Sequence, residues 1–219
     1  MHCFLCQLLE WLVERDDPGW VKNARQRIRA ESYREVNSDR LFEDDADPMR
    51  LRKAYELWDT DPARAFAEFI SLGESGSVWS MEQVATALES GLGTSVDQAR
   101  AEEWYRRAFE RGSDLGLLRA SYLAFTRGAT EEARNILNVG VDRRLTAAMR
   151  YLAEIELQFA TREDERQRAR KLFEQAIELG DVMARVKFAR ARAYGYFGLM
   201  AIPAGIRELR PALHALVPP

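Results

Sequence analysis

The chain has 219 residues, of which 47% are hydrophobic and 31% are charged, and its net charge is −3 at neutral pH. This balance is typical of a folded protein with a substantial core and excludes an intrinsically disordered chain. The slight acidity argues against a general binder of nucleic acids or of anionic membranes. The longest apolar run, residues 197–206, is about half as long as a membrane span and contains Pro203. We therefore expect a cytoplasmic protein.

The N-terminal residues predict an amphipathic helix whose apolar side chains recur at helical spacing. They are Phe4, Leu5, Leu8, Leu9, Leu12 and Val13, and the sequence Asp-Asp-Pro-Gly at residues 16–19 ends the helix. A second helix is expected over residues 20–29. The pattern weakens over 31–47, where an acidic run predicts a solvated connection. Residues 1–46 are therefore expected to form a helical hairpin and an acidic connection that cap the rest of the chain.

From residue 47 the sequence predicts a succession of helices and no strand. Asp61-Pro62 is a strong helix start, Ser95 with Gln98 matches a capping box, and Gly112 is a left-handed helix stop. The tail contains Pro203 and Pro211 and predicts a kinked capping helix. The expected helices cover residues 48–58, 62–73, 78–90, 95–112, 113–127, 130–139, 145–160, 162–179, 181–194 and 201–217.

The helices repeat as pairs, most clearly where they end at Gly76 and Gly112, which stand 36 residues apart. At matching offsets the two copies carry an aspartate, an arginine, an alanine and an aromatic residue. A looser copy ends at Gly180. The matching pairs are Asp61 and Asp97, Arg64 and Arg100, Ala65 and Ala101, and Phe69 and Tyr105. One helical hairpin cannot bury both of its faces, so the hairpins are expected to stack.

Residues 91–112, GLGTSVDQARAEEWYRRAFERG, closely resemble the Sel1-like repeat. The matching residues are Gly91, Gly93, Asp97, Ala101, Trp104, Tyr105, Ala108 and Gly112. The resemblance implies an all-α fold, a right-handed α-solenoid of stacked antiparallel helix hairpins related to tetratricopeptide arrays. The solenoid is expected over residues 47–200, and a C-terminal capping helix and tail over 201–219. The family's usual role is that of a scaffold or adaptor for protein–protein contacts.

Catalytic and metal-binding motifs are weak in this sequence. Both histidines, His2 and His214, lie in terminal segments. With Cys3 and Cys6, His2 offers three zinc ligands where a structural site takes four, and the paired cysteines indicate a reducing compartment. We therefore expect no catalytic residue, no metal and no cofactor. A hydrolase or transferase that uses carboxylates, such as Glu82, Glu89 and Glu154, is the enzymatic alternative.

The first helices of successive hairpins line the inner surface of a helical solenoid, and side chains opposite their core stripe are expected to face a partner. The helical period of about 3.6 residues selects Glu82, Thr86, Leu118, Tyr122, Phe125, Arg150, Glu154, Arg190 and Tyr194. The apolar members among these predict a binding hot spot, and the charged members predict its polar rim. The alternative is a shift of register that buries Tyr122 and Phe125.

These features favour a non-catalytic scaffold that binds a protein partner on its inner face, with no role in binding nucleic acid or membranes. A narrower hypothesis is an immunity protein that neutralises a bacterial toxin or effector, because an acidic inhibitor suits a basic effector. The alternative from a different class is a structural homo-oligomer that assembles through the apolar N-terminal hairpin.

Overall fold

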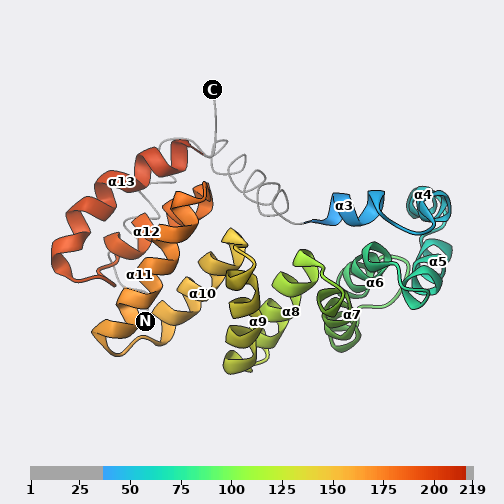
Figure 1. Ribbon diagram of the computed structural model, residues 1–219, viewed down its shortest axis with the longest axis horizontal. Coiled ribbons are helices and arrows are strands. Elements are labelled where there is room, and N and C mark those ends of the chain that lie inside the picture. The colour runs from blue at the N-terminus through green and yellow to red at the C-terminus, as the bar shows by residue number, and fades with distance from the viewer. Residues whose placement is uncertain (1–36, 216–219) are drawn as a thin grey trace. The chain divides into compact units, whose positions relative to one another are not determined.

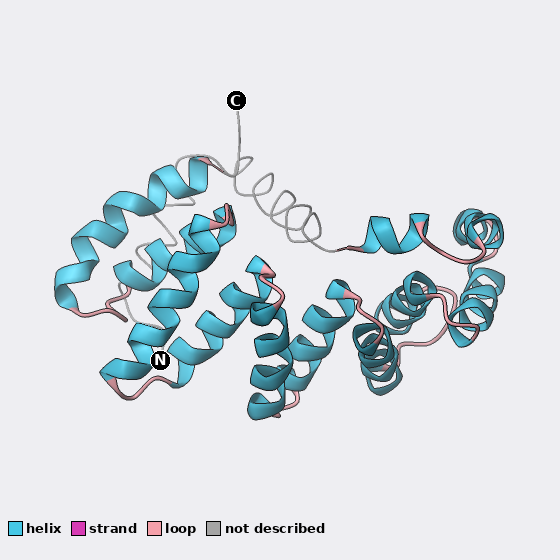
Figure 2. Cartoon of the chain, in the orientation of Figure 1, coloured by secondary structure: helices cyan, strands magenta, loops and turns pink. Residues whose placement is uncertain are grey.

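The computed structural model describes residues 37–215, and over that range the chain folds into helices joined by short loops, without a strand (Figures 1 and 2). The all-α fold expected from the sequence is therefore confirmed. The two helices expected within residues 1–29 lie outside the described residues. None of the helices between residues 37 and 215 is long and apolar enough to span a membrane.

The described helices fall into two compact units, residues 37–143 and residues 144–215. The first unit contains α3 (Ser38–Glu43), α4 (Pro48–Glu56), a 3₁₀ turn (Leu57–Asp59), α5 (Pro62–Glu74), α6 (Val78–Ser90), α7 (Gln98–Glu110), α8 (Asp114–Thr126) and α9 (Thr130–Asp142). The second contains α10 (Thr146–Phe159), α11 (Glu163–Glu178), α12 (Val182–Ala193), a 3₁₀ turn (Leu199–Ala201) and α13 (Ile202–His214). The division expected near residues 46 and 200 remains a prediction.

In the first unit, consecutive helices from α5 to α9 pack against one another as hairpins. Ala101 and Ala108 are fully buried on α7, where their small side chains let neighbouring helices approach closely. Larger rings fill the space between hairpins: the Trp79 ring lies 5.8 Å from that of Phe69 and 5.1 Å from that of Phe42. The repeated alanines and aromatic residues thus serve as core residues.

Helix α7 begins at a different residue from the one that the sequence indicates. Its cap is Asp97, whose carboxylate accepts a hydrogen bond from the Arg100 amide at 3.0 Å, so the capping box predicted at Ser95 is wrong. The Asp97 amide donates to the Leu88 carbonyl at 2.8 Å, which fixes the connection against α6. Gly93 has φ +69°, and a Cβ there would lie 2.1 Å from the carbonyl oxygen of Pro62. This connection therefore packs tightly against the start of α5.

The acidic connection expected over residues 31–47 contains the short helix α3, which the sequence pattern does not indicate. The residue before it, Asn37, is held at the junction of α7 and α8. Its side-chain amide donates to the Gly112 carbonyl at 2.9 Å, and its side-chain oxygen accepts from the Asp114 amide at 3.0 Å. The start of α3 is thus attached to the repeat, so the expectation of a purely solvated loop is wrong here.

The second unit consists of the closely packed pairs α10 with α11 and α12 with α13. Its aromatic core is centred on Phe188, whose ring lies 5.7 Å from that of Phe173 and 5.4 Å from that of Phe197. The tail forms a helix, as expected. Pro203 stands at its second position, where a missing amide hydrogen costs little, and Pro211 lies in its last turn.

Candidate partner-binding face

The first helices of the hairpins are α6 and α8 in one unit and α10 and α12 in the other, and each follows a residue in the capping position. These residues are Ser77, Ser113, Leu145 and Asp181. Counting from them gives equivalent positions on the four helices. The fifth and ninth positions are four residues apart, so they lie on the same side of a helix. Their surroundings nevertheless differ completely.

The fifth position is buried on all four first helices, so exposure of Glu82, Leu118 and Arg150 was predicted wrongly. Glu82 is 0% exposed, Leu118 6% and Arg150 3%, and Val186 at the same position of α12 is also buried. The two polar members reach the capping residue of the next first helix in their own unit. Glu82 bonds Ser113, and Arg150 bonds Asp181. The fifth position therefore faces the seam between successive hairpins.

Glu82 receives a hydrogen bond at each carboxylate oxygen. The Ser113 hydroxyl donates to Oε1 at 2.5 Å, and the Ser38 hydroxyl donates to Oε2 at 2.8 Å. Burial raises the pKa of this carboxyl to about 7, although both hydroxyl hydrogen bonds act in the opposite direction. Ser113 Oγ also accepts from the Gly116 amide at 2.6 Å and so caps α8. Glu82 thus joins α3, α6 and the start of α8.

The buried ion pair of the second unit has the same place in its hairpin. Arg150 Nε lies 3.1 Å from Asp181 Oδ2, and the guanidinium carbon lies 4.6 Å from the centre of the Tyr151 ring. Burial opposes the charge of Arg150, but Asp181, Tyr151 and Glu154 raise its pKa above the ordinary value. The carboxylate of Asp181 also accepts from the Ala184 amide at 2.8 Å. The pair therefore connects α10 to the first turn of α12.

The ninth position forms the accessible row of each first helix. Its members are Thr86, Tyr122, Glu154 and Arg190, all of them exposed or half-buried. Tyr122 is 51% exposed, which contradicts the register shift that would bury it, while Phe125 and Tyr194 are half-buried. In the second unit, Lys187 Nζ donates to Glu154 at 2.8 Å, and Arg190 Nε donates to the Tyr194 hydroxyl at 3.0 Å.

In the first unit, five side chains from α6, α7 and α8 form one connected group, which we call the Tyr122 cluster. Its members are Thr86, Glu89, Tyr105, Arg119 and Tyr122. The Tyr105 hydroxyl lies 3.0 Å from Thr86 Oγ1 and donates to Glu89 at 3.1 Å. Glu89 forms an ion pair with Arg119, whose guanidinium carbon lies 5.2 Å from the centre of the Tyr122 ring.

The sequence prediction of this face included Thr86 and Tyr122 but missed Tyr105 and Arg119. Tyr105 lies on the second helix of its hairpin and was assigned to the core, where its ring indeed packs. Its hydroxyl reaches the side chains of Thr86 and Glu89 on the first helix α6. Arg119 stands three residues before Tyr122, the spacing at which side chains on a helix meet. That spacing was the available signal for Arg119.

Each of the three carboxylates of the enzymatic alternative bonds partners of its own. Glu82 bonds two serine hydroxyls, Glu89 bonds Tyr105 and Arg119, and Glu154 bonds Lys187 in the other unit. Within residues 37–215, no group of three or more histidine, cysteine, aspartate or glutamate side chains is placed to hold a metal ion. The arrangement is that of hydrogen bonds and ion pairs that join neighbouring helices.

Comparison with protein families matches the Sel1 repeat to residues 80–113 and 146–181, which are the hairpins α6–α7 and α10–α11. No curated protein is significantly similar to the chain in sequence. A solved Sel1 repeat protein from Oxalobacter formigenes shares 17% identity over 76% of this chain and 73% of its own, with a TM-score of 0.60.

A second solved structure is a protective antigen present in uropathogenic Escherichia coli strains and described as displaying an SLR (Sel1-like repeat) fold. It shares 15% identity with a TM-score of 0.61, over 94% of this chain and 49% of its own. This chain thus spans about half the length of the antigen. At such identities the likeness shows the fold alone. The two repeat matches show that the chain contains Sel1 repeats, and proteins with such repeats generally mediate protein–protein interactions.

Proposed function

We propose that this chain is a non-catalytic adaptor that binds a protein partner on residues 37–143. The partner would contact the accessible side of the first helices α6 and α8, which we call the first-helix face of this unit, and the Tyr122 cluster would be the anchor. The observation that carries the proposal is the half-exposed ring of Tyr122 beside the guanidinium of Arg119. Tyrosine and arginine are enriched among the side chains that dominate the free energy of protein binding. Both present large contact areas that combine an apolar surface with hydrogen-bonding groups.

The Tyr122 cluster is ordered before any partner arrives. Glu89 holds Arg119, Tyr105 holds Glu89, and Arg119 in turn lies against the Tyr122 ring. A side chain that is already fixed loses less conformational entropy on binding, which favours affinity. In our proposal the apolar ring supplies the anchor and the ion pair around it supplies the polar rim.

The first-helix face of residues 144–215 is assigned a supporting role. Its accessible row carries Glu154 and Arg190; Lys187 forms an ion pair with Glu154, and Tyr194 lies beside Arg190. Mixed charges at an interface select among partners and accelerate encounter more than they add to affinity. We therefore assign specificity to this face and most of the affinity to the Tyr122 cluster.

A narrower form of the proposal is that the partner is a toxin or effector that this chain neutralises as an immunity protein. The net charge of −3 supports it, because an acidic inhibitor complements a basic effector. The test is to produce the captured partner in cells with and without this chain. Growth that fails only without the chain supports the immunity function, and survival of both cultures contradicts it.

The adaptor function is tested by capture of a partner from native lysate on immobilised chain, followed by binding measurements on the partner identified. Tyr122→Ala is the variant. Tyr196→Ala is its control, because that tyrosine is comparably exposed, at 43%, but lies beyond the end of α12 in the other unit. Removal of a hot-spot tyrosine costs at least about 2 kcal/mol, so the Kd should rise roughly 30-fold for Tyr122→Ala alone.

Equal affinity of Tyr122→Ala and wild type, with helical content unchanged, would contradict the assignment of the anchor. The homo-oligomer alternative is tested in parallel by light scattering over a wide range of protein concentration. A stable dimer in place of a monomer would favour it.

A further inference from the structure

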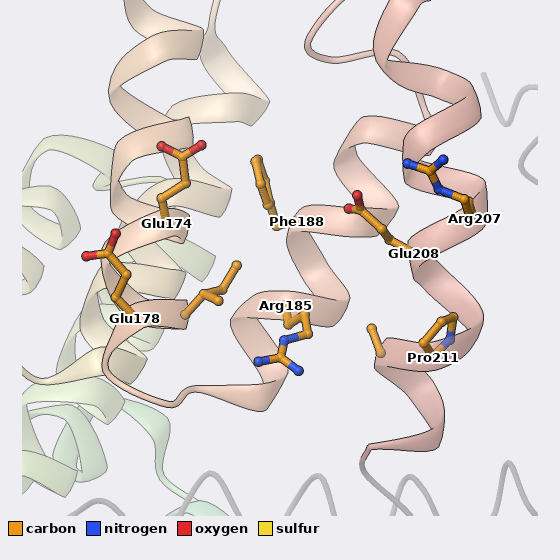
Figure 3. Close-up of a pocket in the computed structure, with 9 residues that line it drawn as sticks. Glu174, Glu178, Arg185, Phe188, Arg207, Glu208 and Pro211 are labelled. Atoms are coloured by element: carbon orange, nitrogen blue, oxygen red, sulfur yellow. The ribbon is translucent and has the colours of Figure 1, made fainter.

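Within the second unit, the helices α11, α12 and α13 border an open groove of about 630 Å³ (Figure 3). Its inner wall is apolar and includes Ile177, Phe188 and Ala212, which come from one helix each. Figure 3 shows the Phe188 side chain projecting into the space between α11 and α13. The groove is thus a concave apolar surface of the kind that receives the apolar side of a helix.

Charged residues surround this apolar wall. Glu208 forms an ion pair with Arg192 at 2.6 Å, and Glu174 forms one with Arg170 at 2.8 Å. Arg185 and Arg207 also line the groove, are exposed, and make no ion pair with another residue in the range 37–215. Glu178, which is exposed and likewise has no ion pair within this range, is the third such charge on the groove, so the rim retains one net positive charge, which suits an occupant with an acidic end.

We propose that the groove binds the chain's own N-terminal segment, residues 4–13, as an amphipathic helix. The six apolar residues of that segment recur at helical spacing and form one continuous side: Phe4, Leu5, Leu8, Leu9, Leu12 and Val13. Such a helix needs a partner surface, because its apolar side is too large to remain in water. The groove offers such a surface within the same molecule.

The charges of the segment complement those of the rim. Residues 1–17 contain four acidic side chains and one arginine, and three of the acids, Glu14, Asp16 and Asp17, follow the apolar stretch. They would lie at one end of the docked helix, where Arg185 or Arg207 can neutralise them. The length of chain also suffices: the residues between Asp17 and Asn37 can extend over roughly 60 Å.

This inference does not rest on the proposed anchor, because α11, α12 and α13 of the second unit form the groove, while the Tyr122 cluster lies in the first unit. It states that residues 4–13 bind the groove of their own molecule. A second copy of the chain offering the same segment is the competing occupant. The two differ in whether the contact is made within one molecule or between two.

The test uses the two natural cysteines, Cys3 and Cys6, which are the only cysteines of the chain and both lie beside or within the segment. Glu178→Cys places a thiol at the groove, and Gln175→Cys places one on the same helix at an exposed residue that does not line the groove. Each full-length variant is treated at low concentration with a short bifunctional maleimide, and the crosslinked peptides are identified by mass spectrometry.

The expected result is a crosslink within one molecule between the segment and residue 178, at least several-fold more abundant than with residue 175. Leu8→Glu with Leu12→Glu should abolish it. The same double variant should accelerate amide hydrogen exchange in α12 and α13 of the otherwise natural chain, without affecting α6 to α8. Equal crosslinking at both positions, crosslinks only between molecules, or unchanged exchange in α12 and α13 would each overturn the proposal.

Discussion

The buried carboxyl of Glu82 makes the stability of this protein depend on pH in a predictable direction. Burial raises its pKa from 4.5 to about 7 in the folded protein, against opposing hydrogen bonds from Ser113 and Ser38. Between these values the native state holds a proton that the unfolded chain releases. The free energy of unfolding therefore decreases as pH rises from about 4.5 to 7. The two pKa values correspond to a contribution of roughly 3 kcal/mol, fully present at low pH and lost above pH 7.

Glu82→Gln removes this dependence because the amide carries no titrating proton and can still bond a serine hydroxyl. The difference in unfolding free energy between wild type and variant should change by roughly 3 kcal/mol between pH 4.5 and pH 8, with wild type becoming relatively less stable. Urea unfolding followed by tryptophan fluorescence measures it, since Trp58, Trp79 and Trp104, the tryptophans within the described range, all lie in the first unit.

Glu103→Gln is the matched control, since Glu103 is exposed on α7. It should leave the pH profile of wild type unchanged. A constant difference between wild type and Glu82→Gln at every pH would refute the reasoning, because it would mean that Glu82 has the same proton affinity in the folded and unfolded states.

Three further changes test individual contacts by chemical or thermal unfolding. Asp181→Ala removes both the buried partner of Arg150 and the cap of α12, so it should lower the free energy of unfolding by about 3–5 kcal/mol. Asp97→Ala, which removes only a half-buried helix cap, should lower it by about 1 kcal/mol. Equal losses in the two variants would contradict this expectation. Gly93→Ala should lower the melting temperature clearly more than Gly128→Ala. Both residues have positive φ, but only at Gly93 would a Cβ meet backbone atoms. Equal melting temperatures would disprove this expectation. Asn37→Ala should accelerate hydrogen exchange at the Asp114 amide, which donates to Asn37, and should lower the free energy of unfolding by about 1–3 kcal/mol. Unchanged exchange at that amide would exclude the contact.

Much of the local structure was predictable because its signals lie within a few residues of each other. Helix α6 spans Val78–Ser90, as the sequence predicts, because a serine cap precedes it and Gly91 with φ +80° ends it. Asp61 and Pro62 likewise start α5 where expected. The repeat of alanines and aromatic residues also indicated stacked hairpins. Such signals act through the backbone and the nearest side chains, so one sequence is enough to read them.

Which side chains of a first helix remain exposed was not predictable in the same way. The helical period placed the fifth and ninth positions on one side, and only the ninth remains accessible. The fifth position is covered because its side chain meets the capping residue of the next first helix, 31 residues away for Glu82 with Ser113 and for Arg150 with Asp181.

The start of α3 is decided in the same manner, since Asn37 reaches Gly112, 75 residues further along the chain. The sequence by itself therefore determined most of the helices, several of their ends and the repeat. Only the tertiary structure decided which residues lie in the seams and which stay exposed. The physical reason is that exposure depends on how closely the next hairpin approaches, and side chains distant in sequence set that distance.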